Sequence, residues 1–486
     1  MNGRSRPAGG AMQDFTQGDI RAPLLRFAAP LFLSNILQAI YNMVDMVVVG
    51  QFVGKAGLSA VSIGGDLLNL LTFLAIGFSN AGQVILAQNL GAGRRGSLGR
   101  IAGNLLTLLL GSALVLTAVC FQLRWQLLRW MNTPPEAWDY ALDYVTTCIP
   151  GLVCIYGYNV VSAVLRGLGD SRHPFMFIAA AAVLNLLLDL LFVAVFRMAA
   201  FGAALATVIG QGVSFFLGLG FLLRRGRGLG LRLTRDCFRP DRAVLGTLVR
   251  VGLPMAIKSA SVTISKLFVD ALVNDCGVVA SSASGIESKL NVVSNLFSNA
   301  VNIGCSTMIG QNIGAEKYDR VPKIMRESFS INLLCALGLS AALLAAPRLV
   351  FGVFTADAEV IAVSMEMIPV LLLIFLGSAF RSPNSGLIDG SGNYRLNFVV
   401  ALLDGIVNRI GFALLFGFAL HMGWLGFLYG DAAAGFTPFL IGGVYYLSGK
   451  WRTAKYIIRG IPETEEKPNG RRQRRNGGRT GPEPPP

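Results

Sequence analysis

Charged residues are scarce in this sequence: Asp, Glu, Lys and Arg together make up 14% of its 486 residues. A soluble domain usually carries about a quarter. The mean hydropathy is +0.57, and 53% of the residues are apolar. A chain of this composition has too little polar surface to face water on all sides. The composition therefore excludes an ordinary soluble protein and predicts a membrane protein.

Motifs for cofactor, metal or nucleotide chemistry are also missing. The seven cysteines show no C-x-x-C spacing, His173 and His421 stand alone, and no G-x-x-x-x-G-K-[ST] phosphate loop occurs. The G-x-G-x-x-G pattern at 91–96 lies between two apolar runs rather than after a strand, and so predicts a turn. We therefore expect neither an enzyme nor a resident cofactor.

Long apolar runs, such as 178–196 and 399–420, recur along the chain and are long enough to cross about 30 Å of hydrocarbon. Strand-like alternation is absent, so the sequence predicts an all-α polytopic membrane protein. Residues 1–20 lack the apolar core of a signal peptide, so we expect the first span to be retained. Twelve spans are predicted, at 24–53, 58–90, 98–123, 137–160, 174–197, 200–224, 243–273, 280–312, 324–347, 356–388, 396–417 and 422–449.

The distribution of basic residues provides a check on the number of predicted spans. Twelve spans place both termini on one side, and that side receives nearly all the Lys and Arg of the loops and tails. This bias predicts cytoplasmic termini in a plasma-membrane protein, and it explains the net charge of +15 without nucleic acid. The opposite side holds only Lys55, Arg124, Arg129, Arg197 and Arg348.

An internal repeat divides the chain into two halves. Segment 87–92 returns at 310–315 with Gln-Asn-x-Gly-Ala in both copies, and Pro30 returns as Pro254, 224 residues later. The offset spans six helices, an even number, so we expect two six-helix lobes related by a pseudo-two-fold axis along the membrane normal. The predicted organisation is an N-terminus (1–23), an N-lobe (24–223), a basic cytoplasmic linker (224–242), a C-lobe (243–449) and a basic, disordered cytoplasmic tail (450–486).

Two acids of the N-terminal half, Asp45 and Asp189, lie within predicted spans with no Lys or Arg at the same depth. An ionised aspartate at the centre of a membrane helix costs about 2.5–3.5 kcal/mol on insertion scales. A proton or Na⁺ is therefore the expected neutralising partner. The alternative is that these groups only hydrogen-bond to each other between helices.

Helical spacing gathers more oxygen atoms around these acids. Gln38 and Tyr41 share one face with Asp45, while Asn185 lies one turn before Asp189. Carboxylate, amide and hydroxyl oxygens suit a hard cation. Further polar groups are expected at the same depth or along the cavity: Thr207 with Ala203 one turn earlier, Tyr144, and Asp66, which lines the cavity mouth or caps backbone.

Three segments resemble the MATE (multidrug and toxic compound extrusion) transporters: residues 30–54, the paired Gln-Asn-x-Gly-Ala turns and the Leu-Arg-Gly-Leu-Gly-Asp loop at 165–170. The resemblance covers residues 20–450. It implies a V-shaped twelve-helix exporter that exchanges amphipathic, often cationic small molecules for inward Na⁺ or H⁺. We expect those substrates and the lipid bilayer to be its partners, and the chain to be a monomer.

The resemblance also implies roles for individual residues. In the prokaryotic branch with a cation site in the N-lobe, Asp45, Asn185, Asp189 and Thr207 match the cation ligands, and Ala203 offers a backbone carbonyl. Pro30 matches a helix 1 proline whose kink is thought to respond to protonation, although a static kink is an equal reading.

The C-terminal half departs from this pattern, because Asp189 corresponds to Phe412 and Thr207 to Gly430. We expect its acids to form structural ion pairs with nearby bases. A cation site in this half, at Asp270, Glu287 or Asp404, is the alternative. The expected pairs are Asp270 with Lys266, Glu287 with Lys289, and Asp404 with Arg409.

A second function stays open, because the same superfamily includes flippases of lipid-linked oligosaccharides. A cavity rich in arginine would favour it. The intramembrane cations that the sequence indicates are Lys258, Lys266, Lys289 and Arg409, all in the second half.

Overall fold

The computed structural model describes residues 13–453 and residue 457. Within these residues the chain is almost entirely helical and has no β-strand, which confirms the all-α prediction. Most of the predicted tail, and the first twelve residues of the predicted N-terminus, lie outside the described residues.

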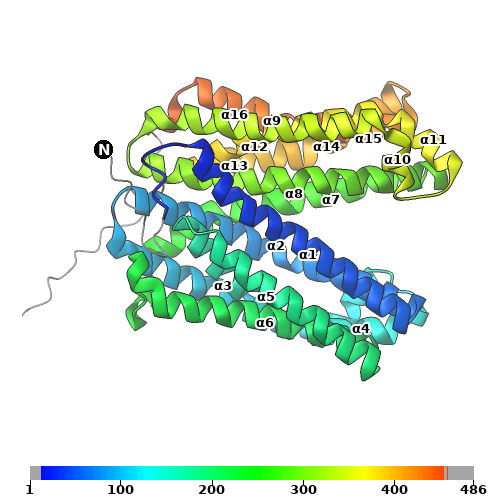
Figure 1. The fold of residues 1–486 in the computed structure, drawn as a ribbon, viewed down its shortest axis with the longest axis horizontal. Coiled ribbons are helices and arrows are strands. Elements are labelled where there is room, and N and C mark those ends of the chain that lie inside the picture. The colour runs from blue at the N-terminus through cyan, green and yellow to red at the C-terminus, as the bar shows by residue number, and fades with distance from the viewer. Residues whose placement is uncertain (1–12, 454–456, 458–486) are drawn as a thin grey trace, which may run out of the picture.

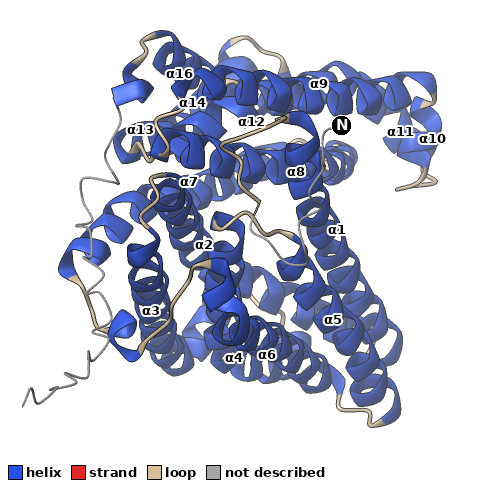
Figure 2. Cartoon of the chain, turned by 60° about the vertical axis from the view of Figure 1, so that its left-hand side comes forward, coloured by secondary structure: helices blue, strands red, loops and turns tan. Residues whose placement is uncertain are grey.

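The helices form two lobes, joined along α2 and α7 (Figures 1 and 2). Apolar side chains drive this packing, since each lobe buries clusters of Leu, Ile, Val and Phe. The N-lobe comprises α1 (Arg21–Phe52), α2 (Lys55–Gly91), α3 (Arg95–Trp130), α4 (Trp138–Gly167), α5 (Arg172–Asp189) and α6 (Ala199–Arg225). The C-lobe comprises α7 (Arg242–Asn274), α8 (Val278–Gly314), α9 (Val321–Ala345), α10 (Pro347–Gly352), α11 (Ala358–Glu366), α12 (Ile368–Ser391), α13 (Tyr394–Leu402), α14 (Asn408–Leu414), α15 (Gly423–Ala434) and α16 (Thr437–Leu447).

Ten helical stretches of the described chain are long and apolar enough to cross a membrane. The predicted twelve are completed by α8, which is long but more polar, and by the α15–α16 pair. Two predicted spans are less regular than expected. The span at 356–388 consists of α11 and α12 with a break at Met367, and the span at 422–449 is broken between α15 and α16.

Three π-helical turns interrupt the fifth span of the two lobes, one in the N-lobe and two in the C-lobe. Leu190–Val195 directly follows Asp189, and Leu415–Ala419 lies at the equivalent place in the second half. The third, Leu403–Val407, contains Asp404 and has no π-helical counterpart in the N-lobe. Such turns are common at functional sites because they re-aim side chains.

The repeated Gln-Asn-x-Gly-Ala segments meet each other where the lobes are joined. A Cβ on Gly91 would lie 1.9 Å from the carbonyl oxygen of Gln311, and one on Gly314 would lie 2.1 Å from that of Gln88. Only glycine permits this backbone approach. The amide of Gln83 also donates to Thr307 at 2.6 Å. The repeat therefore encodes the contact that holds the two lobes together at this end.

Helix α1 belongs to both lobes. Its first turns, with Leu24 and Phe27, pack in a cluster made largely of C-lobe residues, together with Phe15 of the preceding segment. Its later part contacts α5. The backbone of Phe15 is held by the side chains of Gln311 and Asn312, each at 3.1 Å. Helix α1 thus connects the C-lobe core to the predicted cation site.

The linker between the lobes packs on α3. The amide of Asn104 donates to the carbonyls of Cys237 and Arg239 at 3.2 Å, and Arg100 pairs with Asp241 at 3.0 Å. Asp241 also caps α7 by accepting from Ala243 N–H. The basic linker is consequently fastened to the N-lobe.

Candidate functional site

Two carboxyl groups meet inside the N-lobe. Asp45 of α1 and Asp189 at the end of α5 are 4% and 1% exposed, and they interact electrostatically with each other. One oxygen of Asp45 and both oxygens of Asp189 have no hydrogen-bond partner among the described residues. Burying two ionised carboxylates side by side without a partner is costly, because an unpaired charge loses its hydration and like charges repel.

The predicted oxygen ligands surround this pair. The hydroxyl of Thr207 in α6 lies 3.5 Å from Asp45 Oδ2. Asn185, one turn before Asp189, is 3% exposed, and its amide has no partner among the described residues. Tyr41, Asn185 and Thr207 line a small cavity of about 10 Å³, which is room for a single water-sized species. These hard oxygen donors fit Na⁺ as well as a proton.

Other predicted residues take supporting places. Ala203 is fully buried one turn before Thr207, within the core that also contains Tyr144. Pro30 lies inside a continuous α1, and its carbonyl accepts from the Ser34 hydroxyl at 2.8 Å. Proline lacks the N–H that would donate to the carbonyl four residues earlier in the helix. The Ser34 hydroxyl binds the carbonyl of Pro30 itself, one turn after that missing hydrogen bond.

A cavity of about 560 Å³ opens along the inner face of the N-lobe. The residues predicted to line it do so: Gln38, Tyr41, Tyr144 and Asp66. Asp45 and Thr207 also reach it, so the carboxyl pair communicates with the cavity through Asp45. Asp66 is exposed to the cavity and is attracted by Lys289 of the other lobe.

The C-lobe also buries a pair of carboxyl groups, but with a base between them. Arg409 pairs with Asp404 at 3.3 Å and with Asp431 of α15, and all three are buried. The expected pair of Asp404 and Arg409 is confirmed. Asp431 was missed by the sequence reasoning, although its place within the predicted twelfth span marked it as an intramembrane acid.

The other two expected pairs are wrong as direct contacts. Lys266 and Asp270 form no ion pair within 4.0 Å among the described residues, and neither do Glu287 and Lys289. Glu287 is 2% exposed and accepts instead from the amide of Asn291 at 3.2 Å. Glu287 and Lys289 are two residues apart and leave α8 on different faces. Lys266 and Asp270 share one face of α7 but interact only at longer range.

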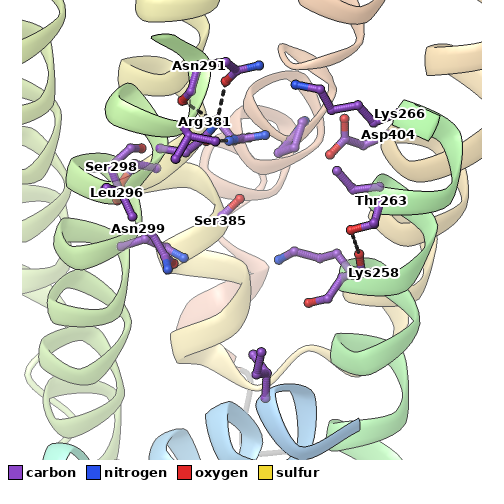
Figure 3. A pocket seen from close by; sticks show the side chains of 18 of the residues that line it. Lys258, Thr263, Lys266, Asn291, Leu296, Ser298, Asn299, Arg381, Ser385 and Asp404 are labelled. Atoms are coloured by element: carbon purple, nitrogen blue, oxygen red, sulfur yellow. Dashed lines mark hydrogen bonds between the residues drawn. The ribbon is translucent and has the colours of Figure 1, made fainter. Parts of the chain in front are cut away.

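A second cavity, of about 590 Å³, lies along the C-lobe (Figure 3). Lys258 and Lys266 of α7 and Arg381 of α12 line it. Lys258 pairs with Asp389 at 3.2 Å. This cavity shares lining residues with the N-lobe cavity, so the two form halves of one central space: Asn35, Ile76, Ser259 and Asn299.

Two cavity arginines were missed by the sequence reasoning. Arg166 lies in the last turn of α4 and lines the N-lobe cavity, where it donates to Gln83 and Ser162 at 2.7 Å. Arg381 lies inside α12. A hydropathy pattern ends a predicted span near a charged residue. A helix that faces an aqueous cavity can include such a residue, because the side chain stays hydrated there. Gln211, one turn after Thr207, was also missed, and that spacing was the available signal.

Comparison with known proteins identifies this architecture. The family model named MatE matches the chain twice, over residues 30–191 and 254–415, and the two matches begin 224 residues apart. This chain belongs to the MATE family. The two matches coincide with the internal repeat, so each six-helix lobe is one copy of the family unit.

Relatives cover nearly the whole MATE chain. “Probable multidrug resistance protein YpnP” of Bacillus subtilis is 28% identical over 450 residues, spanning 91% of this chain and 98% of its own. “Probable multidrug resistance protein NorM” of Thermotoga maritima is 24% identical over 451 residues, spanning 91% and 95%. A solved outward-facing MATE multidrug resistance transporter superposes with a TM-score of 0.81 at 22% identity, covering 90% and 98%. The chain is thus a polytopic transporter of this family.

Proposed function

We propose that this MATE protein exports amphipathic small molecules in exchange for Na⁺ or H⁺, with the coupling ion bound in the N-lobe. The observation that carries the proposal is the buried pair Asp45 and Asp189, which has no basic partner among the described residues. This supports the N-lobe branch of the family rather than a cation site at Asp270, Glu287 or Asp404.

The coupling follows from the place of Asp45. Its helix, α1, carries the ion ligand in one half and packs into the C-lobe core with its other half. A proton or Na⁺ that neutralises Asp45 and Asp189 removes their repulsion and draws α1, α5 and α6 together. Since α1 also forms the wall of the cavity, this movement changes the contact with a substrate.

The orientation proposed here places both termini in the cytoplasm of a cell bounded by the plasma membrane, as the basic loops indicate. The joined end of the lobes, with its paired glycine contacts, is then the cytoplasmic gate. Rocking of the two lobes about this contact would expose the cavity to each side in turn. The chain acts as a monomer in the bilayer, and its substrates reach the cavity between the lobes.

Efflux from cells tests the proposal. Asp45→Asn and Asp189→Asn remove the charge and keep the shape, so each is expected to abolish efflux of a fluorescent dye while the protein still reaches the membrane. Asp139→Asn, at a loop-proximal first turn outside the site, is the matched control and keeps wild-type efflux. Wild-type efflux from both site variants would refute the N-lobe mechanism.

A further inference from the structure

The C-lobe half of the central cavity presents cations to its interior. Lys258 and Lys266 stand two turns apart on one face of α7, and Arg381 reaches the same space from α12 (Figure 3). Lys266 and Arg381 also line a side chamber of about 190 Å³, so the two lie close to one another. The N-lobe half, in contrast, presents the carboxylates of Asp45 and Asp66 together with one base, Arg166, which donates to Gln83 and Ser162. Bases therefore predominate in the C-lobe half of the central cavity, and carboxylates in the N-lobe half.

The acids of the C-lobe are mostly engaged by partners, but Asp404 itself lines this cavity and Asp431 lines the side chamber, and both attract Arg381 at longer range. Asp404 and Asp431 are bound to Arg409, and Asp389 is bound to Lys258. Glu287 is buried and accepts from Asn291. Asp270, half-buried one turn after Lys266 on α7, attracts it only at longer range, as do Glu287 and Asp431.

Two cations remain available to a ligand. Lys266 makes no ion pair within 4.0 Å among the described residues. Arg381 donates to the side chain of Asn295 and likewise forms no ion pair in the described part of the chain. A charged donor in a partly desolvated cavity binds an anionic ligand strongly when it has no anionic partner of its own. Charge-assisted hydrogen bonds are roughly twice as strong as neutral ones.

The rest of the lining suits a small amphipathic anion. Amide side chains from α8 provide further donors, including Asn295 and Asn299, while Phe73, Ile76 and Val262 offer an apolar wall. A cavity of about 590 Å³ lies within the usual range of small-molecule sites, about 300–1,000 Å³.

We propose that the C-lobe half of the cavity is an anion subsite, in which Lys266 and Arg381 bind a carboxylate, sulfonate or phosphate group of the transported amphiphile. That this ligand is transported rests on the proposed export function, whereas binding of the anionic group does not. A substrate that spans both halves is then an anion or a zwitterion, with any cationic group placed toward Asp66 in the N-lobe half.

Equilibrium binding to the purified full chain in a neutral detergent tests the subsite with three matched fluorescent probes. Dansylglycine carries a carboxylate, dansylamide is neutral, and dansylcadaverine carries an ammonium group. Lys266→Gln is expected to weaken dansylglycine binding about tenfold, the loss of one charge-assisted contact, and to leave dansylamide binding within about twofold. Arg381→Gln is expected to do the same. Lys323→Gln, an exposed cation at the start of α9 in the same lobe and outside this cavity, is the control and should bind all three probes as wild type does.

Unchanged dansylglycine affinity in Lys266→Gln overturns the proposal, and so does an equal loss for all three probes. If Arg381→Gln does not fold, Lys266→Gln alone decides. Binding needs no ion gradient, so a wild-type protein that binds dansylglycine but shows no ion-driven exchange in vesicles counts against the export function and not against the subsite.

Competition identifies the source of the anionic group. Decyl phosphate represents a free amphiphile, and a polyprenyl phosphate in nanodiscs represents a lipid-linked one. Displacement of dansylglycine by decyl phosphate supports a subsite for free amphiphiles. Displacement by the polyprenyl phosphate alone supports the subsite and assigns it to a flippase. Displacement by neither contradicts an anion subsite.

Discussion

The two lobes bury carboxyl groups differently, because only the C-lobe places a base between two of them within the described chain. Arg409 joins Asp404 to Asp431, whereas Asp45 and Asp189 face each other without a base among the described residues. The position of Arg409 corresponds, at the repeat offset of 223, to Leu186. The C-lobe cluster therefore contains a permanent cation that the N-lobe pair lacks. This difference underlies the proposal that the N-lobe is the ion-responsive half of the duplicated fold.

Removing the permanent cation should give the largest effect on stability. Arg409→Gln leaves two buried acids unpaired, and we expect a loss of about 3–5 kcal/mol, the range for breaking a buried pair from one side. Thermal unfolding in detergent would measure it. Asp189→Asn removes a repulsion instead and should not lower the unfolding temperature. Equal destabilisation by the two variants would break the contrast between the lobes.

Neutralising the N-lobe pair should give the largest effect on transport. Asp189→Asn is expected to reduce ion-driven efflux at least about a hundredfold, equivalent to about 2.7 kcal/mol, because the pair no longer needs a cation. Asp404→Asn leaves Arg409 paired with Asp431 and should keep most of the activity. Uptake into inverted vesicles measures both. A reversed order would move the coupling site to the C-lobe.

Equivalent substitutions in the two lobes should have equal effects at the contact between the lobes, unlike at the buried carboxyl groups. Gly91→Leu and Gly314→Leu each force a side chain against the facing backbone, and overpacking of this kind costs about 1–3 kcal/mol. Both should favour separation of the lobes at this end, seen as a longer spin-label distance across it. Gly111→Leu, which has open space around it, is the control. A response from only one of the pair would argue against a symmetric gate.

The smallest expected effect separates Na⁺ from H⁺. Thr207→Val removes a hydroxyl 3.5 Å from Asp45, a long and weak hydrogen bond. If Na⁺ is the coupling ion, losing this oxygen ligand should raise the Na⁺ concentration for half-maximal efflux by about threefold to tenfold, a cost of about 0.7–1.4 kcal/mol. If the ion is a proton, efflux should keep its pH dependence. Titrating Na⁺ and pH separately in sealed vesicles distinguishes the two.

Much of this architecture was predictable from the sequence. Apolar runs locate the spans, and the repeated segments at 87–92 and 310–315 give the two lobes and their offset. Depth in the spans and the family resemblance also grouped Asp45, Asn185, Asp189 and Thr207. In the structure Asp45 contacts Thr207 and interacts with Asp189, while Asn185 and Thr207 line one small cavity. These features depend on local periodicity, which one sequence displays directly.

The remainder depends on contacts between distant segments. Asp431 joins Arg409 across 22 positions, and Lys258 reaches Asp389 across 131. Arg166 and Arg381 were not recognised as cavity residues because hydropathy cannot distinguish a helix face toward a polar cavity from a helix end. The sequence reasoning therefore located the acids of the N-lobe half and the two lysines of the C-lobe half, but missed both arginines.

The most direct test of the central claim is ion movement driven by substrate in proteoliposomes, recorded with a Na⁺-selective dye and a pH dye. Wild type and Asp270→Asn should both move one of these ions against the substrate flux, because Asp270 lies outside the coupling pair. Asp45→Asn and Asp189→Asn should move neither. Coupled ion movement that survives in both N-lobe variants and disappears in Asp270→Asn would contradict an N-lobe coupling site.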